Sequence, residues 1–171
     1  MLNVRQAWLL VHIGLGSGFL HGSLVGARTL TDLRNHPETD RARDRAVLVM
    51  AAAAWLTVIT GTWTVYSWYR ATPTSGVPTL AYPKAWLVTH SHLAVWHEFG
   101  MEWKEHVGWL APVLATTVAV MVIRHQSVLR ADWRARRLVS ALFSLALVAA
   151  LIAAVLGAAI NKVAPNQFLS M

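Results

Sequence analysis

The sequence has no cysteine among its 171 residues, and this absence removes several classes of site. Disulfides, thiolate metal ligands, iron–sulfur clusters and covalently attached c-type haem all need cysteine sulfur. The sequence also lacks a nucleophile elbow, a phosphate-binding loop and a dinucleotide fingerprint, because its repeated glycines lie within one continuous apolar run. Hydrolysis and nucleotide chemistry therefore have no support in the sequence.

Acidic residues are also scarce. The chain has 8 Asp and Glu against 15 Lys and Arg, while 56% of its residues are hydrophobic and the mean hydropathy is +0.44. This composition is typical of membrane proteins. Ten of the arginines gather in two short segments between apolar runs, five in 28–45 and five in 124–137. Membrane topology explains that placement better than binding to nucleic acid, which we do not expect as a partner.

Four apolar runs are long enough to cross a bilayer as helices. They predict an all-α fold, a four-transmembrane-helix bundle that forms a single integral membrane domain over residues 1–171. Between the second and third runs, prolines are followed by an apolar and aromatic stretch, which predicts an outer interfacial helix. The expected spans are residues 4–27, 46–69, 107–123 and 138–160, with an outer segment at 70–106.

The two arginine-rich segments indicate how the chain is oriented. Both fall on the same side of a four-span chain, and the positive-inside rule makes that side cytoplasmic. The N-terminus, the C-terminus and the segment 70–106 are then expected outside. Seven of the nine tryptophans fall near the expected outer boundary, as an aromatic belt would. The lipid bilayer is accordingly an expected partner of the chain.

The densest polar cluster of the sequence lies just before the third span. It holds every acidic residue found outside the two arginine-rich segments, together with histidines, and these are costly beside a membrane unless they bind something. Carboxylates and imidazoles bind iron, manganese or zinc in helical bundles. The cluster therefore predicts a non-haem metal site as one alternative, with His97, Glu98, Glu102 and His106 as its ligands.

The same cluster has two other interpretations. Its carboxylates can pair with nearby cations, namely Lys104, Arg5 or Lys84, in which case the cluster is structural. Alternatively, a histidine with a neighbouring carboxylate can hydrogen-bond a quinone headgroup at the interface and accept protons from the quinol. The sequence leaves these alternatives open.

Two histidines, His12 and His21, lie within the first span, where a histidine is by default a functional hypothesis. Nine residues at about 100° each place the two rings on opposite faces of a helix, so they cannot both bind one metal ion. For an outer site, His12 is best paired with His106. For an inner site, His21 can be paired with His125, although a loop histidine among arginines is the simpler interpretation of His125.

Glycines recur every four residues along the first span, at Gly14, Gly18, Gly22 and Gly26. Such spacing favours the close approach of another helix. It also leaves room for a flat cofactor against the helix, and the two interpretations are compatible.

A cysteine-free chain with four spans and with His12, His21 and His106 in these positions resembles the small membrane subunits of respiratory enzymes that carry b-type haem and exchange electrons with quinone. The resemblance implies one or two b haems, held by histidines among His12, His21, His97 and His106. The chain differs from the common pattern because its second and fourth spans contain no histidine and because it carries acidic residues before the third span.

From the resemblance we expect a haem b electron-transfer subunit of a respiratory, quinone-linked oxidoreductase complex in the inner membrane of a bacterial cell. The chain would be a subunit of a cytochrome b-type complex with partner subunits, rather than a complete enzyme. Two alternatives remain at this point, a non-haem metal-binding membrane protein and a cofactor-free structural subunit of a membrane complex.

Overall fold

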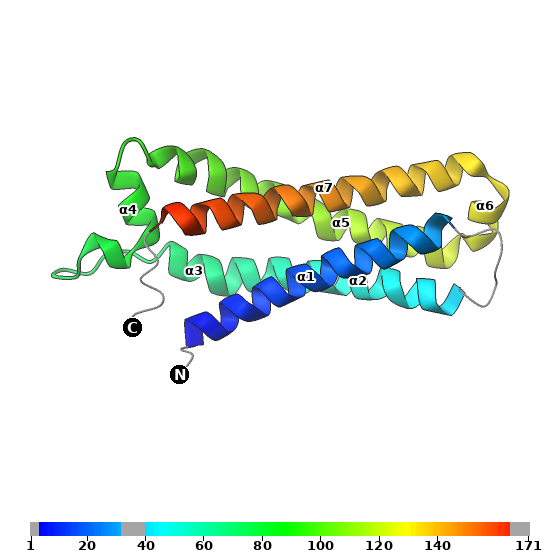
Figure 1. Ribbon diagram of the computed structural model, residues 1–171, viewed down its shortest axis with the longest axis horizontal. Coiled ribbons are helices and arrows are strands. Elements are labelled where there is room, and N and C mark those ends of the chain that lie inside the picture. The colour runs from blue at the N-terminus through cyan, green and yellow to red at the C-terminus, as the bar shows by residue number, and fades with distance from the viewer. Residues whose placement is uncertain (1–3, 32–39, 165–171) are drawn as a thin grey trace.

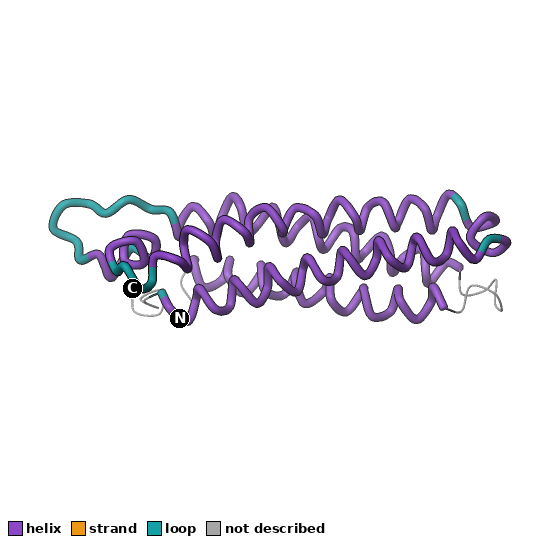
Figure 2. Tube along the Cα trace, turned by 90° about the horizontal axis from the view of Figure 1, so that it is seen from above, coloured by secondary structure: helices purple, strands orange, loops and turns teal. Residues whose placement is uncertain are grey.

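The computed structural model describes residues 4–31 and 40–164, and within them every regular element is a helix (Figures 1 and 2). Four long helices lie roughly parallel, which confirms the predicted all-α bundle. The first is α1 (Val4–Thr31), the second runs through α2 (Asp40–Thr60), η2 (Gly61–Val65) and α3 (Tyr66–Tyr69), the third joins η4 (Trp96–Met101) to α5 (Glu102–Arg124), and the fourth is α7 (Trp133–Val163).

All four long helices have the length and apolar composition needed to cross a membrane, over Val4–Ala27, Asp40–Tyr69, Trp96–Arg124 and Trp133–Val163. The third begins at Trp96 and not near residue 107 as expected from hydropathy. The acidic residues before residue 107 therefore belong to the first turns of a spanning helix. Hydropathy placed the boundary too late because it registers the charge of a segment but not the continuity of its backbone hydrogen bonds.

A short helix does lie between the second and third long helices, as predicted. It is α4 (Pro83–Thr89), which begins with Pro83 at a position where the missing N–H costs nothing, and it follows a turn of three residues, η3 (Thr79–Ala81). This helix is shorter than expected and ends before the acidic cluster. Figure 1 shows α4 at the same end of the bundle as the start of α1 and the end of α7. We call this the α4 end.

The opposite end carries the arginine-rich segments and the short helix α6 (Gln126–Ala131) (Figure 1), and we call it the α6 end. Residues 32–39 of the first arginine-rich segment lie outside the described residues. Arg43 is almost fully buried here, with ion pairs to Asp40 at 2.7 Å and to Asp44 at 3.2 Å. Asp40 also pairs with Arg130, and Asp44 accepts a hydrogen bond from Gln126. These contacts tie the start of α2 to α6.

The four long helices form a ring. α1 packs along α2, α2 along α5 and α5 along α7, and a smaller contact between α7 and α1 closes the ring. Where α2 meets α5, the Trp55 indole donates a hydrogen bond to Thr116 at 2.9 Å, and Trp109 packs edge-on against Trp55. In this order α1 lies diagonally across the bundle from α5.

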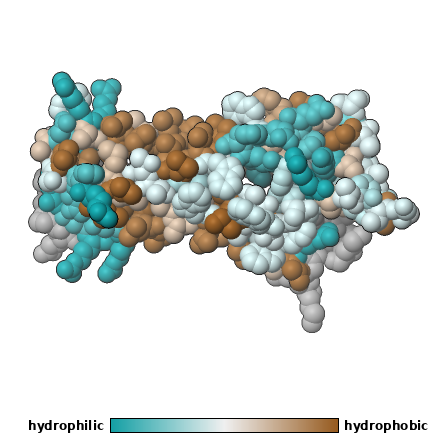
Figure 3. Space-filling view, turned by 180° about the vertical axis from the view of Figure 1, so that it is seen from behind, coloured by the Kyte–Doolittle hydropathy of each residue, from teal (hydrophilic) through white to brown (hydrophobic). Residues whose placement is uncertain are grey.

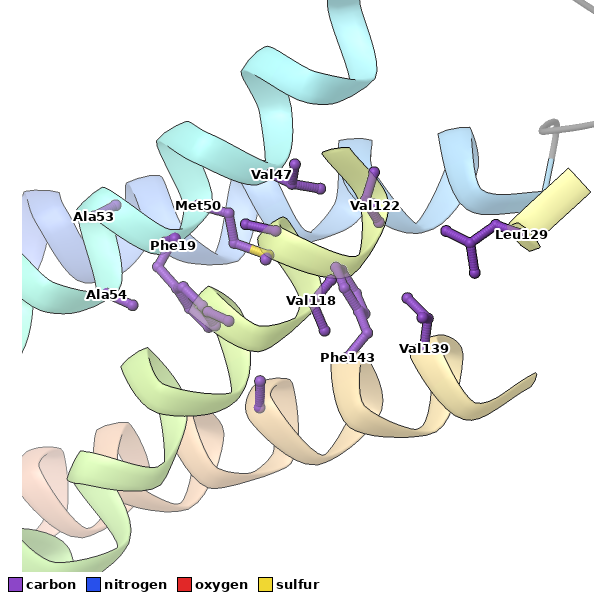
Figure 4. Close-up of a cluster of buried hydrophobic side chains, with 14 residues drawn as sticks. Phe19, Val47, Met50, Ala53, Ala54, Val118, Val122, Leu129, Val139 and Phe143 are labelled. Carbon is purple, nitrogen blue, oxygen red and sulfur yellow. The ribbon is translucent and has the colours of Figure 1, made fainter. Parts of the chain in front are cut away.

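The larger hydrophobic core fills the half of the bundle towards the α6 end (Figure 4). All four long helices contribute to it, with Phe19 from α1, Met50 from α2, Val118 from α5 and Phe143 from α7. A second, smaller cluster of buried residues lies at the α4 end and includes Tyr69, Leu87, Met101, Ile160 and Ala164. Figure 3 shows the corresponding surface pattern on one face: hydrophilic residues at the α6 end and over the half nearer the α4 end, with hydrophobic residues between them.

The glycines of α1 differ in how closely other side chains and helices approach them. A methyl group at Gly22 would lie 3.4 Å from the Met50 backbone, and one at Gly26 would lie 3.3 Å from the Phe143 ring. These two glycines permit the close approach of neighbouring helices that the sequence predicts. A methyl group at Gly14 or Gly18 would meet no atom within 4 Å, so these two positions leave space open beside α1.

Candidate functional site

A layer of polar groups separates the two hydrophobic clusters. It contains His12 on α1, Thr57 and Thr60 on α2, and Lys104 on α5, and it is completed by glycines on the second and fourth helices. His12 lies eight residues after Val4 and Lys104 lies eight residues after Trp96, so both are about 12 Å along their helices from the α4 end. We call this set of residues the polar layer.

The His12 ring is held by the neighbouring helix. Its Nδ1 lies 2.9 Å from the Thr57 carbonyl oxygen and 3.2 Å from Thr60 Oγ1. Because a carbonyl oxygen can only accept, Nδ1 donates the proton, and the neutral ring keeps the lone pair of Nε2 free. The Thr60 hydroxyl donates a hydrogen bond to the Leu56 carbonyl at 2.8 Å, which fixes the orientation of the hydroxyl that contacts His12. His12 thus has a defined tautomer and a defined orientation.

Gly61 makes this position of His12 possible. A methyl group at residue 61 would lie 2.8 Å from His12 Cε1, closer than two carbon atoms can pack. Gly61 is the first residue of η2, a π-helical turn inserted between α2 and α3. Such turns occur often at functional sites, since the widened turn displaces side chains from their regular helical positions.

We expect Gly61→Ala to displace the His12 ring and to lower the free energy of unfolding by about 1–3 kcal/mol, as overpacking does. The matched control is Gly14→Ala, which adds the same methyl group where no atom lies within 4 Å and should stabilise the protein by up to about 1 kcal/mol, because alanine favours a helix interior over glycine. Unfolding of both variants in detergent, followed by circular dichroism, measures the difference. Equal stabilities would show that the His12 ring is not packed on residue 61.

Lys104 is the charged member of the polar layer. Its side chain lies against the neighbouring helix α7, where a methyl group at Gly157 would lie 3.1 Å from Cε and 3.5 Å from Nζ. In the described residues it forms no salt bridge, although the charge is close enough to act on His12 and on Glu105. Lys104 therefore brings a positive charge into the layer from the helix diagonal to that of His12.

Towards the α4 end the polar groups pair with one another. The Arg70 guanidinium donates to Glu102 at 3.0 Å, and the Tyr69 hydroxyl shares a hydrogen bond of 3.1 Å with Nδ1 of the buried His97. Tyr66 Oη and Glu105 Oε1 are both buried, and although they make no hydrogen bond of regular geometry they lie close enough for the hydroxyl and the carboxylate to interact. This region contains the acidic residues that the sequence singled out, so part of the cluster is structural.

The structure does not bring His12 and His106 together. His106 is exposed, and its Nδ1 donates to the Glu102 carbonyl of its own helix at 2.6 Å. Lys104 faces the bundle interior, and two residues further along an α-helix the direction has turned by about 200°. His106 therefore points away from the polar layer. His21 is exposed on α1, and His125 is exposed between α5 and α6, so these two do not form an interior pair either.

The ligands proposed for a non-haem metal do not converge. His97 bonds Tyr69, Glu98 is exposed and Glu102 is paired with Arg70. Among residues 4–31 and 40–164, no three histidine, aspartate or glutamate side chains come close enough to hold a metal ion. Among the described residues, the one salt bridge of this cluster joins Glu102 to Arg70, and not to Lys104, Arg5 or Lys84, the cations suggested by the sequence.

The sequence distinguishes His12 but not the residues that position it. Thr57 and Gly61 belong to an apolar span without any charge, where nothing in the sequence distinguishes them from other small or hydroxylated residues. Lys104 was interpreted only as a counter-ion for the acidic cluster. The sequence does indicate which way Lys104 faces. Gly108, Ala111 and Ala115 follow Lys104 at helical spacing, so Lys104 lies on the core-facing side of α5, where the residues are small.

Comparison of the chain with models of protein families, with curated proteins and with solved structures finds no match.

Proposed function

We propose that this chain is a membrane-embedded haem b electron-transfer subunit of a quinone-linked oxidoreductase complex. The observation that carries the proposal is His12, an imidazole inside a spanning helix with Nδ1 on the Thr57 carbonyl and Nε2 free. A histidine in a membrane span has a cost and is functional by default. An imidazole that binds iron is held in this way, with the second nitrogen donating to a carbonyl that sets the ring orientation.

The residues around His12 are compatible with its role as an iron ligand. The Thr57 carbonyl raises the basicity of the ring and Gly61 leaves it room. When bound, haem b supplies a reversible one-electron couple. No second histidine of the described chain lies in the polar layer, which supports one haem and not two.

A quinone headgroup is proposed at His106. This ring is exposed in the half of the bundle nearer the α4 end, its Nδ1 donates to the Glu102 carbonyl and its Nε2 is available to a ligand. Trp109 follows one turn later on the same helix and offers an apolar surface for a ring. Through Nε2 the imidazole can donate to a quinone oxygen or accept a proton from the quinol.

Orientation and partners belong to the same proposal. The arginine-rich α6 end would face the cytoplasm, by the positive-inside rule, and the α4 end with both termini would face outside. His12 and His106 would then serve the outer half of a bacterial inner membrane. An electron-transfer subunit needs a donor and an acceptor, so other subunits of a membrane redox complex are the proposed partners.

The test is an optical spectrum of the purified protein, oxidised and then reduced with dithionite, with metal analysis of the same sample. A Soret band with sharp α and β bands on reduction, and about one iron per chain, is the expected result. A colourless protein with a stoichiometric metal would replace the proposal by a non-haem metal protein. A colourless and metal-free protein would indicate a structural subunit.

A further inference from the structure

The arginines at the α6 end differ in what they contact. Arg43 and Arg130 take part in the ion pairs at the start of α2, and the Arg136 guanidinium donates to two carbonyls at the end of α6, at 2.8 and 3.0 Å. Arg134 and Arg137, in the first two turns of α7, are exposed, and no salt bridge among the described residues includes either of them. The packing of the helices therefore leaves these two cations unexplained.

Both arginines stand above an apolar face of α7. They are three residues apart, so their side chains lie on the same side of the helix. From Arg134, steps of four and three residues, which follow one face of a helix, lead only to exposed apolar side chains. We call this line of residues the α7 stripe: Leu138, Ala141, Leu145, Val148, Ile152 and Val155.

The α7 stripe is nearly as long as the apolar part of a bilayer is thick. Val155 lies seventeen residues after Leu138, on a helix that runs from the α6 end to the α4 end (Figure 1). At 1.5 Å per residue the stripe spans about 26 Å, compared with about 30 Å for the hydrocarbon core. A lipid acyl chain can lie along this face, and the arginines above it are then at the depth of the lipid headgroups.

Trp133 supports the same depth. It precedes Arg134 and is 56% exposed, and its ring lies 5.8 Å from the Arg134 guanidinium carbon. Exposed tryptophans are typical of the boundary between lipid tails and headgroups. A cation held against an aromatic ring at this boundary is placed beside the phosphates of the adjacent lipids.

We infer that Arg134 and Arg137 bind the phosphate of an anionic phospholipid whose acyl chains lie along the α7 stripe. A guanidinium binds a phosphate through two parallel hydrogen bonds. Asp132 accepts a hydrogen bond from the Arg134 N–H at 2.8 Å and caps the start of α7, so the guanidinium groups supply the donors and the helix end does not. A zwitterionic lipid fits less well, because its own cation competes with the arginines for the phosphate.

The experiment measures the affinity of the full-length protein for phosphatidylglycerol and for phosphatidylcholine by native mass spectrometry. Each arginine near a membrane surface strengthens the attraction of anionic lipid roughly fivefold, so Arg134→Gln with Arg137→Gln should weaken phosphatidylglycerol binding about 30-fold. Phosphatidylcholine binding should change little. The matched control is Arg41→Gln with Arg45→Gln, which removes the same charge from exposed positions of α2, the helix diagonal to α7, and should stay near the wild-type affinity.

Two outcomes would overturn the lipid site. One is an equal loss of affinity in both double variants, since net charge alone would then explain the binding. The other is a wild-type protein that binds phosphatidylglycerol no better than phosphatidylcholine. Glycerophosphoglycerol, the same headgroup without acyl chains, tests the α7 stripe: it should bind far more weakly than the lipid, and an equal affinity would replace the lipid by a soluble phosphate ester.

Discussion

His12→Gly is expected to lose the haem absorbance of the purified protein completely. The substitution removes the imidazole whose Nδ1 is held by the Thr57 carbonyl, and no other histidine of the described chain lies in the polar layer to replace it. Exogenous imidazole should restore the Soret band, because glycine leaves space at residue 12 for a free ring beside Gly61. Reduced-minus-oxidised spectra with and without imidazole measure both effects.

Two single substitutions provide the controls for this result. His21→Ala and His106→Ala each remove a histidine that the sequence also suggested as a haem ligand, but both side chains are exposed and face away from the polar layer. Both variants should keep the haem. Loss of haem in His106→Ala with retention in His12→Gly would refute the assignment of the ligand. Rescue by imidazole separates a lost ligand from a misfolded protein.

Arg43→Leu is expected to lower the free energy of unfolding by about 3–5 kcal/mol, the usual cost of removing one partner from a buried ion pair. Arg43 is 1% exposed and bridges Asp40 and Asp44, which in turn bind Arg130 and Gln126 of α6. Its removal leaves Asp44 without a cation. The contacts of Asp40 with Arg130 and of Asp44 with Gln126 still join α2 to α6, so the loss comes from the carboxylate left without its cation, and thermal unfolding in detergent measures it.

The control for Arg43 lies two residues along the same helix. Arg45→Leu removes the same charge from the same arginine-rich segment, but Arg45 is exposed and the change should cost no more than about 0.5 kcal/mol. Membrane topology depends on the total positive charge of the segment, so both variants disturb orientation equally. If Arg45→Leu were as destabilising as Arg43→Leu, the effect would be one of charge and not of the buried ion pairs.

Much of the fold could be predicted from composition and hydropathy. The four spans follow from runs of apolar residues long enough to cross a bilayer, and α4 follows from the aromatic stretch that Pro83 begins. The start of the third helix could not be predicted. The residues from Trp96 to His106 look interfacial because they are charged, yet their backbone continues through η4 into α5, and Arg70 neutralises Glu102 there.

Only part of the candidate site could be predicted from the sequence, as was true of the fold. His12 could be selected from the sequence because an intramembrane histidine stands out against its apolar neighbours. Its pairing with His106 could not be tested, since sequence gives depth along a helix but not the order of helices around the bundle. With α1 diagonal to α5 and with His106 turned to the outside, the two rings face different surroundings.

The sequence by itself determined the class of the protein: an all-α bundle of four apolar helices with positive charge at one end and two histidines, His12 and His21, within the first span. These features depend on the hydrophobic effect and on helical periodicity, which act within a short segment. Only the tertiary structure decided what surrounds His12. The Thr57 carbonyl, the missing side chains at Gly61 and Gly157, and the cation of Lys104 come from three other helices, and their meeting depends on how those helices pack.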